Sequence, residues 1–237
     1  MKIRSIALLA MSIPAYLLAA ARADPLLAIY YAFDAPPSAA FVAEMQAEVD
    51  RILADAGVRV AWRALESPRN GEDFQGVVFL RFRGVCSGDQ ASLVGGSRSD
   101  PSGKSLGKTD IEDGRVLPFG TVDCDRLRRF VEPVLNALGG EEKNASVGRA
   151  IARVGAHEIY HMLTGSEEHA PRGIARASLS RADLTAPAFA FAEAQAKWLR
   201  TWAATPSGRP EDEAAGLRPS LADDGIQDGG RDVSAGR

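Results

Sequence analysis

The chain is poor in cysteine and in aromatic residues and has no excess of basic over acidic residues, and each of these features excludes some classes of protein. Only two cysteines occur among 237 residues, and neither lies in a CxxC motif or beside a histidine, which argues against a cysteine metal or redox site. Aromatic residues make up 7% and are not interleaved with basic residues, as they would be on a platform for stacking bases. The net charge is −3, so we expect no nucleic-acid partner.

Long apolar runs are also missing, except at the N-terminus. Two basic residues precede an apolar run over residues 6–18, and small residues at positions 21 and 23 suit a signal peptidase. This pattern predicts a secretory signal peptide over residues 1–23, cleaved before Asp24. The run is shorter than the roughly 20 residues that cross a bilayer, which disfavours the alternative of an uncleaved anchor. We therefore expect a secreted or periplasmic protein without stable membrane insertion.

Export decides how the two cysteines are interpreted. In an oxidising compartment an isolated pair is expected to form a disulfide, so we predict a bond between Cys86 and Cys124, the alternative being two separate buried thiols. The composition of the whole chain, 46% hydrophobic and 25% charged, is ordinary for a globular protein, and we expect one domain over residues 24–204. Residues 205–237 have too few large apolar side chains to offset their ordering entropy and are predicted to form a disordered tail.

The apolar periodicity predicts an alternation of strands and helices. Asp113-Gly114 is a hairpin signal between two of the strands, Pro133 predicts a kink inside one helix, and Ser180 to Asp183 resembles a capping pattern that opens a short helical turn. Strands are predicted at 26–33, 58–65, 77–82, 106–111 and 115–122, and helices at 39–56, 124–138, 147–164 and 188–201. The Gly- and Ser-rich residues 87–105 are expected to form a long loop.

All three histidines of the chain, His157, His161 and His169, fall within thirteen residues. The first two stand in the motif His-Glu-Ile-Tyr-His, and residues four apart lie on one face of a helix, where two imidazoles can reach one ion. Gly165 allows the chain to leave the helix in a left-handed turn, so His169 can return to complete a third ligand. Three protein ligands that leave one position for water are typical of a catalytic zinc site.

Glu158 follows the first ligand directly and is predicted to be the general base. A zinc ion lowers the pKa of a bound water toward about 7, and a carboxylate beside it can take the proton and pass it to a leaving amide nitrogen. The alternative is an ordinary solvated helix with two surface histidines. Apolar residues on both sides of the motif indicate a core-facing helix instead, where unpaired polar groups would cost several kcal/mol and a metal would satisfy them.

The stretch HEIYHMLTGSEEHAPRGIA, residues 157–175, resembles the metzincin clan of zinc peptidases. It is more similar to a group of exported bacterial zincin-like proteins, in which a third His follows HExxH by eight positions and a Gly-Ile-Met stretch comes next. Residues 116–126 (VLPFGTVDCDR) also look like that group. The resemblance implies an α+β, metzincin-like fold, with a twisted mixed β-sheet, a backing helix and an active-site helix beneath an open cleft. It also implies that His157, His161 and His169 hold Zn²⁺ and that Glu158 is the base.

The sequence departs from the metzincin clan at one point and from the related group at another, and each departure leads to an expectation about the site. Metzincins place the third His six residues after the second and a Gly three residues after it, whereas His169 follows by eight and Gly165 by four, so the connecting turn must differ. Ala175 stands where the related group has Met. A Met floor makes no bond to the metal, so its absence is expected to reduce the rigidity of the site without removing the metal.

These patterns together predict an exported, monomeric zinc metallopeptidase that hydrolyses peptide or protein substrates. One alternative is a non-catalytic zinc-binding scaffold that binds a protein partner, and another is a zinc hydrolase of a different amide, such as a cell-wall peptide. Glu167 and Glu168 are interpreted as a solvated loop, the alternatives being extra metal ligands or a selector for the charge of the substrate. Arg172 and Arg176 are interpreted as surface charge, the alternative being a clamp for a substrate carboxylate. Tyr160 is interpreted as packing or rim.

Overall fold

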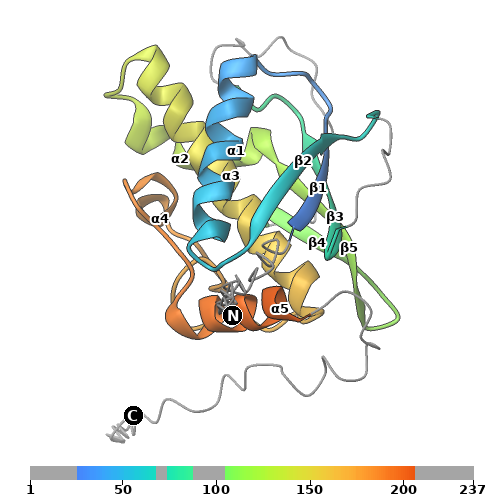
Figure 1. Cartoon of the computed structure of the whole chain (residues 1–237). Helices are drawn as coiled ribbons and strands as arrows, with labels where there is room; N and C mark the ends of the chain where they lie inside the picture. Colours follow the sequence, from blue (N-terminus) through green and yellow to red (C-terminus); the bar gives the residue numbers. More distant parts are fainter. Residues whose placement is uncertain (1–25, 68–73, 88–104, 206–237) are drawn as a thin grey trace, which may run out of the picture.

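The computed structural model describes residues 26–67, 74–87 and 105–205 (Figure 1). The predicted signal peptide, most of the predicted 87–105 loop and nearly all of the predicted tail therefore lie outside the described residues. No helix within the described ranges combines the length and the apolar character that a bilayer crossing requires. The described chain has an α+β architecture, in which helices lie against a five-stranded mixed sheet.

The sheet has four parallel strands and one antiparallel edge strand (Figure 1). The strand order is β2-β1-β3-β5-β4, and the strands are β1 Leu26–Phe33, β2 Arg59–Ala64, β3 Gly76–Arg83, β4 Gly107–Glu112 and β5 Arg115–Asp123. The β4–β5 hairpin turns at Asp113 and Gly114, whose φ angles of 49° and 73° are both positive. The Asp-Gly signal is thus confirmed, because a two-residue hairpin turn of this kind needs positive φ at both positions.

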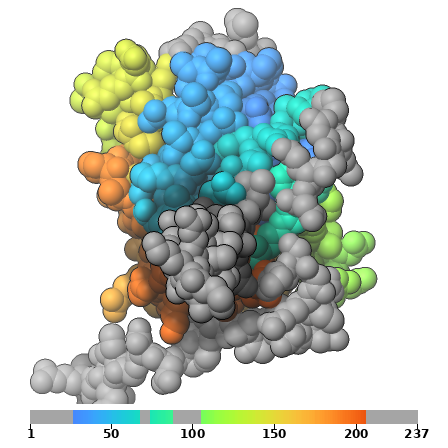
Figure 2. Space-filling model, in the orientation of Figure 1, coloured from blue at the N-terminus to red at the C-terminus, as the bar shows by residue number. Residues whose placement is uncertain are grey.

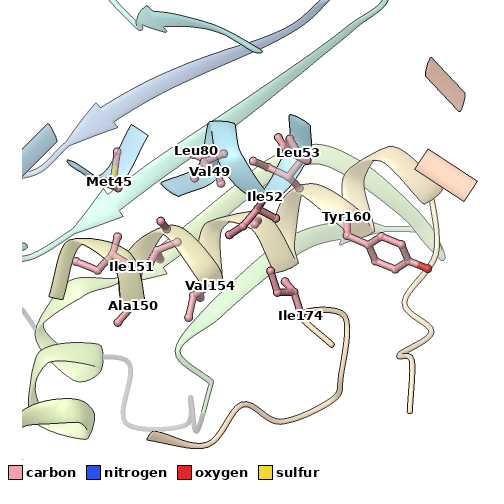
Figure 3. Packing of buried hydrophobic residues seen from close by; sticks show 14 of the residues in the cluster. Met45, Val49, Ile52, Leu53, Leu80, Ala150, Ile151, Val154, Tyr160 and Ile174 are labelled. Carbon is pink, nitrogen blue, oxygen red and sulfur yellow. The ribbon is translucent and has the colours of Figure 1, made fainter. Parts of the chain in front are cut away.

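Two long helices cover one face of the sheet. The backing helix α1, Ala39–Ala54, packs against α3, Gly140–Thr164, and α3 packs against β5. Figure 3 shows how apolar side chains of α1, such as Val49 and Ile52, meet those of α3, such as Ile151, with Leu80 of β3 beside them. Because these side chains recur at helical spacing on α1 and at alternate positions on β3, the periodicity correctly places them in one core.

The opposite face of the sheet carries a row of stacked aromatic rings. Tyr30, Phe79 and Phe119 stand at paired positions on three neighbouring strands, with ring centroids 5.3 and 5.0 Å apart. The helix-covered face of β3 is instead buried at Val78, Leu80 and Phe82. The surface of α1 occupies the middle of the molecular face in Figure 2, between α2, Cys124–Leu135, and the strands of the sheet. Helix α1 therefore lies at the surface on this side and covers α3, most of whose residues are buried.

The predicted disulfide is formed. Cys86, just after β3, is bonded to Cys124, the first residue of α2, and both cysteines are fully buried. The bond ties the end of a central strand to the start of a helix, 38 residues apart in sequence. In the chain-entropy treatment a closed loop of that size contributes about 3–4 kcal/mol to stability.

The ends of all four predicted helices differ from the structure. α1 ends at Ala54, two residues before its predicted end, and α2 continues through Pro133 but stops at Leu135, three residues short of its predicted end. α3 begins at Gly140, seven residues before the predicted start. Its first turn carries Glu141 and Glu142, whose negative charges favour a helix N-terminus without adding any apolar periodicity.

The last helix begins later than predicted. The prediction was 188–201, whereas α5 spans Glu193–Ala204. Residues 188–192, called here the return segment, are extended and contact residues 173–174 through their backbone: Ile174 N donates to Ala190 O at 3.1 Å, and Gly173 bridges Phe191. This long-range pairing overrides the local helical pattern. The short helix α4, Arg181–Thr185, does open with the predicted capping box of Ser180 and Asp183.

Candidate metal centre

The histidine motif lies in the last two turns of α3. Glu158, Ile159, Tyr160 and His161 are all buried, and the helix ends at Thr164. Gly165 follows with φ 59°, the left-handed conformation that turns the chain away from the helix axis. The predicted helix end is therefore confirmed, and the turn directs residues 166–169 back toward the motif.

The structure brings all three histidines together. One nitrogen from each of His157, His161 and His169 can be chosen so that the three atoms lie within 4.8 Å of one another. The rings of His161 and His169 have centroids 4.8 Å apart, and those of His157 and His161 have centroids 4.7 Å apart. Among the described residues these three could hold a metal ion. His161 is buried and His169 is exposed, so the cluster opens to solvent on the His169 side.

Hydrogen bonds to the backbone orient two of the rings. Nδ1 of His157 lies 2.7 Å from the carbonyl oxygen of Ile174, and Nδ1 of His161 lies 2.7 Å from that of Ser166. A carbonyl can only accept, so in each ring Nδ1 carries the proton and Nε2 presents a bare lone pair in the neutral form. These two Nε2 atoms are 3.0 Å apart. Two lone pairs at this distance repel each other, and a cation between them turns that repulsion into attraction.

The protonation equilibria of the histidines favour the ligand form. Burial, with a smaller contribution from the two neighbouring histidines, lowers the pKa of His157 to about 4, against a raising effect of the Ile174 carbonyl. Burial also lowers the pKa values of His161 and His169. A metal ligand must be neutral imidazole, so the cluster is already in its binding form at neutral pH.

Glu158 stands beside the histidines and is held by the sheet. Its side chain is 5% exposed, and its Oε2 accepts a hydrogen bond of 2.7 Å from Oγ1 of Thr109 on β4. Burial raises the pKa of Glu158 to about 7, although the Thr109 hydrogen bond opposes the rise. A carboxyl group with a pKa near neutrality can both take and release a proton under physiological conditions.

Close approach of α3 to the hairpin depends on Gly107. A Cβ atom built on Gly107 would lie 2.6 Å from Oε1 of Glu158 and 2.7 Å from Cγ1 of Val154. Only glycine therefore leaves room for the carboxylate between the helix and β4. The segment 116–126, singled out by its resemblance, forms β5 and the start of α2, and lies next to α3 through Gly120.

A short segment below the histidines supplies the carbonyl that orients His157. This floor segment, residues 170–176, is closed by a hydrogen bond of 2.8 Å from Ala170 N to Ala175 O, and Ile174 and Ala175 are fully buried. Figure 3 shows the Ile174 side chain on the α3 side of this loop. Gly173 has φ 73°, and a Cβ there would lie 2.5 Å from the backbone nitrogen of Ala192, so the return segment can lie against it. Ala175 thus occupies a closed, well-packed position.

Two hollows border the histidines. One, of about 310 Å³, lies over the cluster and Glu158 and is bounded by β4 residues from Gly107 to Ile111 and by Glu167. The other, of about 230 Å³, lies beside His157 and Glu158 and is walled mainly by apolar side chains: Leu106, Phe130, Val154 and Leu179. Arg176 also lines it and forms an ion pair with Asp183. Arg176 is therefore engaged inside the fold, which the surface interpretation did not anticipate, whereas Glu167, Glu168 and Arg172 are exposed as predicted.

The residues that support the site from outside the motif could not be predicted from the sequence. Thr109, Gly107 and the carbonyls of Ile174 and Ser166 are brought to the motif by the hairpin and by two turns. A carbonyl carries no side-chain signature, and a Gly or Thr in a strand is unremarkable in one sequence. Tyr160 is buried and packs against His161 and Phe191, which agrees with its interpretation as packing.

In comparisons with known proteins, no protein-family model matches the chain, and no curated protein matches it either.

Proposed function

We propose that the protein is an exported zinc-dependent metallopeptidase with a metzincin-like fold. The observation that carries this proposal is the convergence of His157, His161 and His169, with two Nε2 lone pairs facing each other 3.0 Å apart and Glu158 adjacent. Three neutral imidazoles with one open side suit Zn²⁺, which catalytic sites hold with three protein ligands. The mixed sheet with one antiparallel edge strand, a backing helix and a motif-bearing helix supports the metzincin resemblance.

A bound zinc ion would supply Lewis acidity and an acidified water molecule. The chain's own contribution is the placement and basicity of Glu158. Thr109 holds Oε2, and the missing side chain at Gly107 leaves space around Oε1. With a pKa near 7, the carboxylate can accept a proton from water and deliver it to the departing amide nitrogen, so that one water adds across the peptide bond.

The shape around the site favours an extended peptide as the substrate. Within the described residues β4 pairs with β5 alone, so its outer edge, which borders the larger hollow, has no neighbouring strand. An extended peptide can satisfy such an edge by adding as a further strand. The apolar hollow beside Glu158 is large enough to take one apolar side chain of that peptide. The buried disulfide supports function in an oxidising compartment.

The test is metal analysis of the purified full-length protein combined with digestion of a peptide library, with and without a chelator. We expect about one zinc per chain and cleavage that the chelator abolishes. Glu158→Gln should retain zinc and lose at least a hundredfold in turnover, the range that general acid–base groups contribute. Absence of bound zinc would contradict the proposal.

Ala175 stands in the floor segment where the related group has Met. This difference favours one alternative, a zinc-binding scaffold that recruits a protein without cleaving it. Zinc bound at full occupancy, with no cleavage in any peptide pool, would support that alternative over the peptidase.

A further inference from the structure

A buried network of charges connects α1 to α3 on the side of α3 away from the sheet hairpin. Arg153 lies four residues before His157 and is completely buried, and its Nε donates to Oε1 of Glu48 at 2.8 Å. Glu48, which is 6% exposed, also accepts from Nε of Arg51 at 2.9 Å. A fully buried arginine is rare, and burying it is tolerated only when its charge and its donors are satisfied.

The same network reaches the segments below the metal centre. Nη1 of Arg153 donates to the carbonyl oxygen of Asp183 at 2.8 Å, and Nη2 of Arg51 donates to that of Phe189 at 2.8 Å. Phe189 belongs to the return segment, whose next residue, Ala190, accepts from Ile174 N at 3.1 Å. The carbonyl of Ile174 in turn accepts from Nδ1 of His157. A continuous path of short contacts thus runs from the Glu48 carboxylate to the ring of His157.

We propose that Arg51, which is held by Glu48, positions the return and floor segments and thereby orients His157 for metal binding. Arg51 is a positioning residue, because it touches neither the histidines nor the hollows around them. The inference rests on the proposed function, since it assigns these side chains a role at the proposed zinc site. It explains why three charged groups are placed beside the core where apolar side chains could pack α1 on α3 equally well.

Burial raises the pKa of Glu48, but the hydrogen bonds from Arg51 and Arg153 outweigh it, so the net pKa is lowered and Glu48 is ionised at neutral pH. The carboxylate therefore keeps both guanidinium groups in place over the range in which the metal site would operate. A neutral Glu48 could hold only one of them well.

The first experiment measures zinc affinity of full-length Arg51→Met by competition with a chromophoric chelator. Removing a group that supports a ligand from outside the metal shell typically costs 10–100-fold in affinity, and we expect about tenfold here because the contact is indirect. The visible absorption spectrum of the Co²⁺-loaded variant should also shift, reporting altered ligand geometry. Zinc affinity within twofold of wild type together with an unchanged Co²⁺ spectrum would overturn the proposal.

Glu44→Gln is the matched control. Glu44 pairs with Arg149 at 3.4 Å and joins the same two helices one turn earlier, without contact to residues 183–190. Zinc affinity and the Co²⁺ spectrum should remain those of wild type, so a change in this control as large as that in Arg51→Met would overturn a specific positioning role.

A double variant, Glu48→Leu with Arg153→Met, separates positioning from stability. Replacing a buried ion pair by apolar side chains of similar size often preserves stability, so the variant should unfold near the wild-type temperature. Zinc affinity should still fall about tenfold, because Arg51 and the Asp183 carbonyl lose their partners. A double variant with wild-type stability and wild-type zinc affinity would show that the network is only structural. If this variant does not fold, the zinc affinity and Co²⁺ spectrum of Arg51→Met decide whether the proposal holds.

A metal-free measurement separates this inference from the proposed function. The Nδ1 proton of His157, observed by NMR in chelator-treated protein, should exchange with water several-fold faster in Arg51→Met than in wild type or Glu44→Gln. Failure of the wild type to bind zinc would refute the proposed function, while this exchange rate would still test the positioning path. An unchanged exchange rate would overturn the path itself.

Discussion

Two polar clusters border helix α3, and they differ in one respect. The cluster on the α1 side, formed by Glu48, Arg51 and Arg153, contains both signs of charge, and its buried carboxylate accepts hydrogen bonds from both guanidinium groups. The cluster on the cleft side contains three imidazoles and Glu158, with lone pairs and a carboxyl group but no cation of its own. Burial of polar groups without compensation is costly, and a metal ion held by the three histidines could supply that compensation.

The comparison separates two reasons for burying polarity in a core-facing helix. A network that contains both signs of charge ties α1 to α3, whereas the incomplete cluster, which has lone pairs but no cation, could hold a metal ion. Each cluster also has a distinct response to mutation, pH and metal, and the following experiments use those responses in order of decreasing expected effect.

The largest loss in the free energy of unfolding is expected from Glu48→Leu alone. This change leaves Arg153 buried without its carboxylate, and breaking a buried pair in this way costs about 3–5 kcal/mol. Chemical denaturation of the variant measures the loss. Glu44→Leu, which breaks the more exposed Glu44–Arg149 bridge, should cost less than about 1 kcal/mol. Equal losses in the two variants would remove the distinction between a buried network and a surface ion pair.

The second effect concerns zinc and the incomplete cluster. Free zinc at about a thousand times its Kd should raise the free energy of unfolding of the wild type by about 4 kcal/mol, because the ion binds only the folded state. His161→Ala removes one of the three ligands and should abolish this stabilisation in thermal unfolding. Glu167→Gln, an exposed neighbour, should keep it. A wild-type response in His161→Ala would show that zinc binds elsewhere.

The third effect is a pH dependence of the metal-free protein. The pKa of Glu158 is about 7 in the folded protein, whereas the ordinary value, taken here for the unfolded chain, is 4.5. Above pH 7 the folded protein must therefore bury a charge that the unfolded chain leaves in water. Glu158→Gln removes this cost and should stabilise the protein by up to about 3 kcal/mol at pH 8. The advantage should shrink as pH falls through 7 and vanish below 4.5. A stability difference that does not change with pH would contradict the raised pKa.

The smallest loss of stability is expected from a change at Gly107, where the β4–β5 hairpin meets the incomplete cluster. Gly107→Ala places a methyl group within 2.6 Å of Oε1 of Glu158 and should cost about 1–3 kcal/mol by overpacking, with a parallel loss of peptidase activity. Gly140→Ala is the control, since nothing lies within 4 Å of that position and alanine suits a helix. Urea unfolding compares the two. A neutral Gly107→Ala would mean that α3 can move away from β4 without penalty.

Much of the fold was predictable from periodicity, and the exceptions have specific causes. The strands were placed to within about one residue at each end, because buried and exposed positions alternate in β3 and β5. Helix ends were less accurate where charge or long-range backbone pairing decided them, at the first turn of α3 and in the return segment. The disulfide was predicted from compartment and cysteine count, and the structure confirms it.

The histidine spacing alone determined that His157 and His161 share a face of one helix, because the α-helical repeat places residues four apart one above the other. The glycine after Thr164 likewise determined where that helix ends. Only the tertiary structure decided that His169 returns to the pair, that Thr109 and Gly107 accommodate Glu158, and that Ile174 orients His157. These contacts join segments far apart in the chain through backbone groups and missing side chains, which leave no local pattern in a sequence.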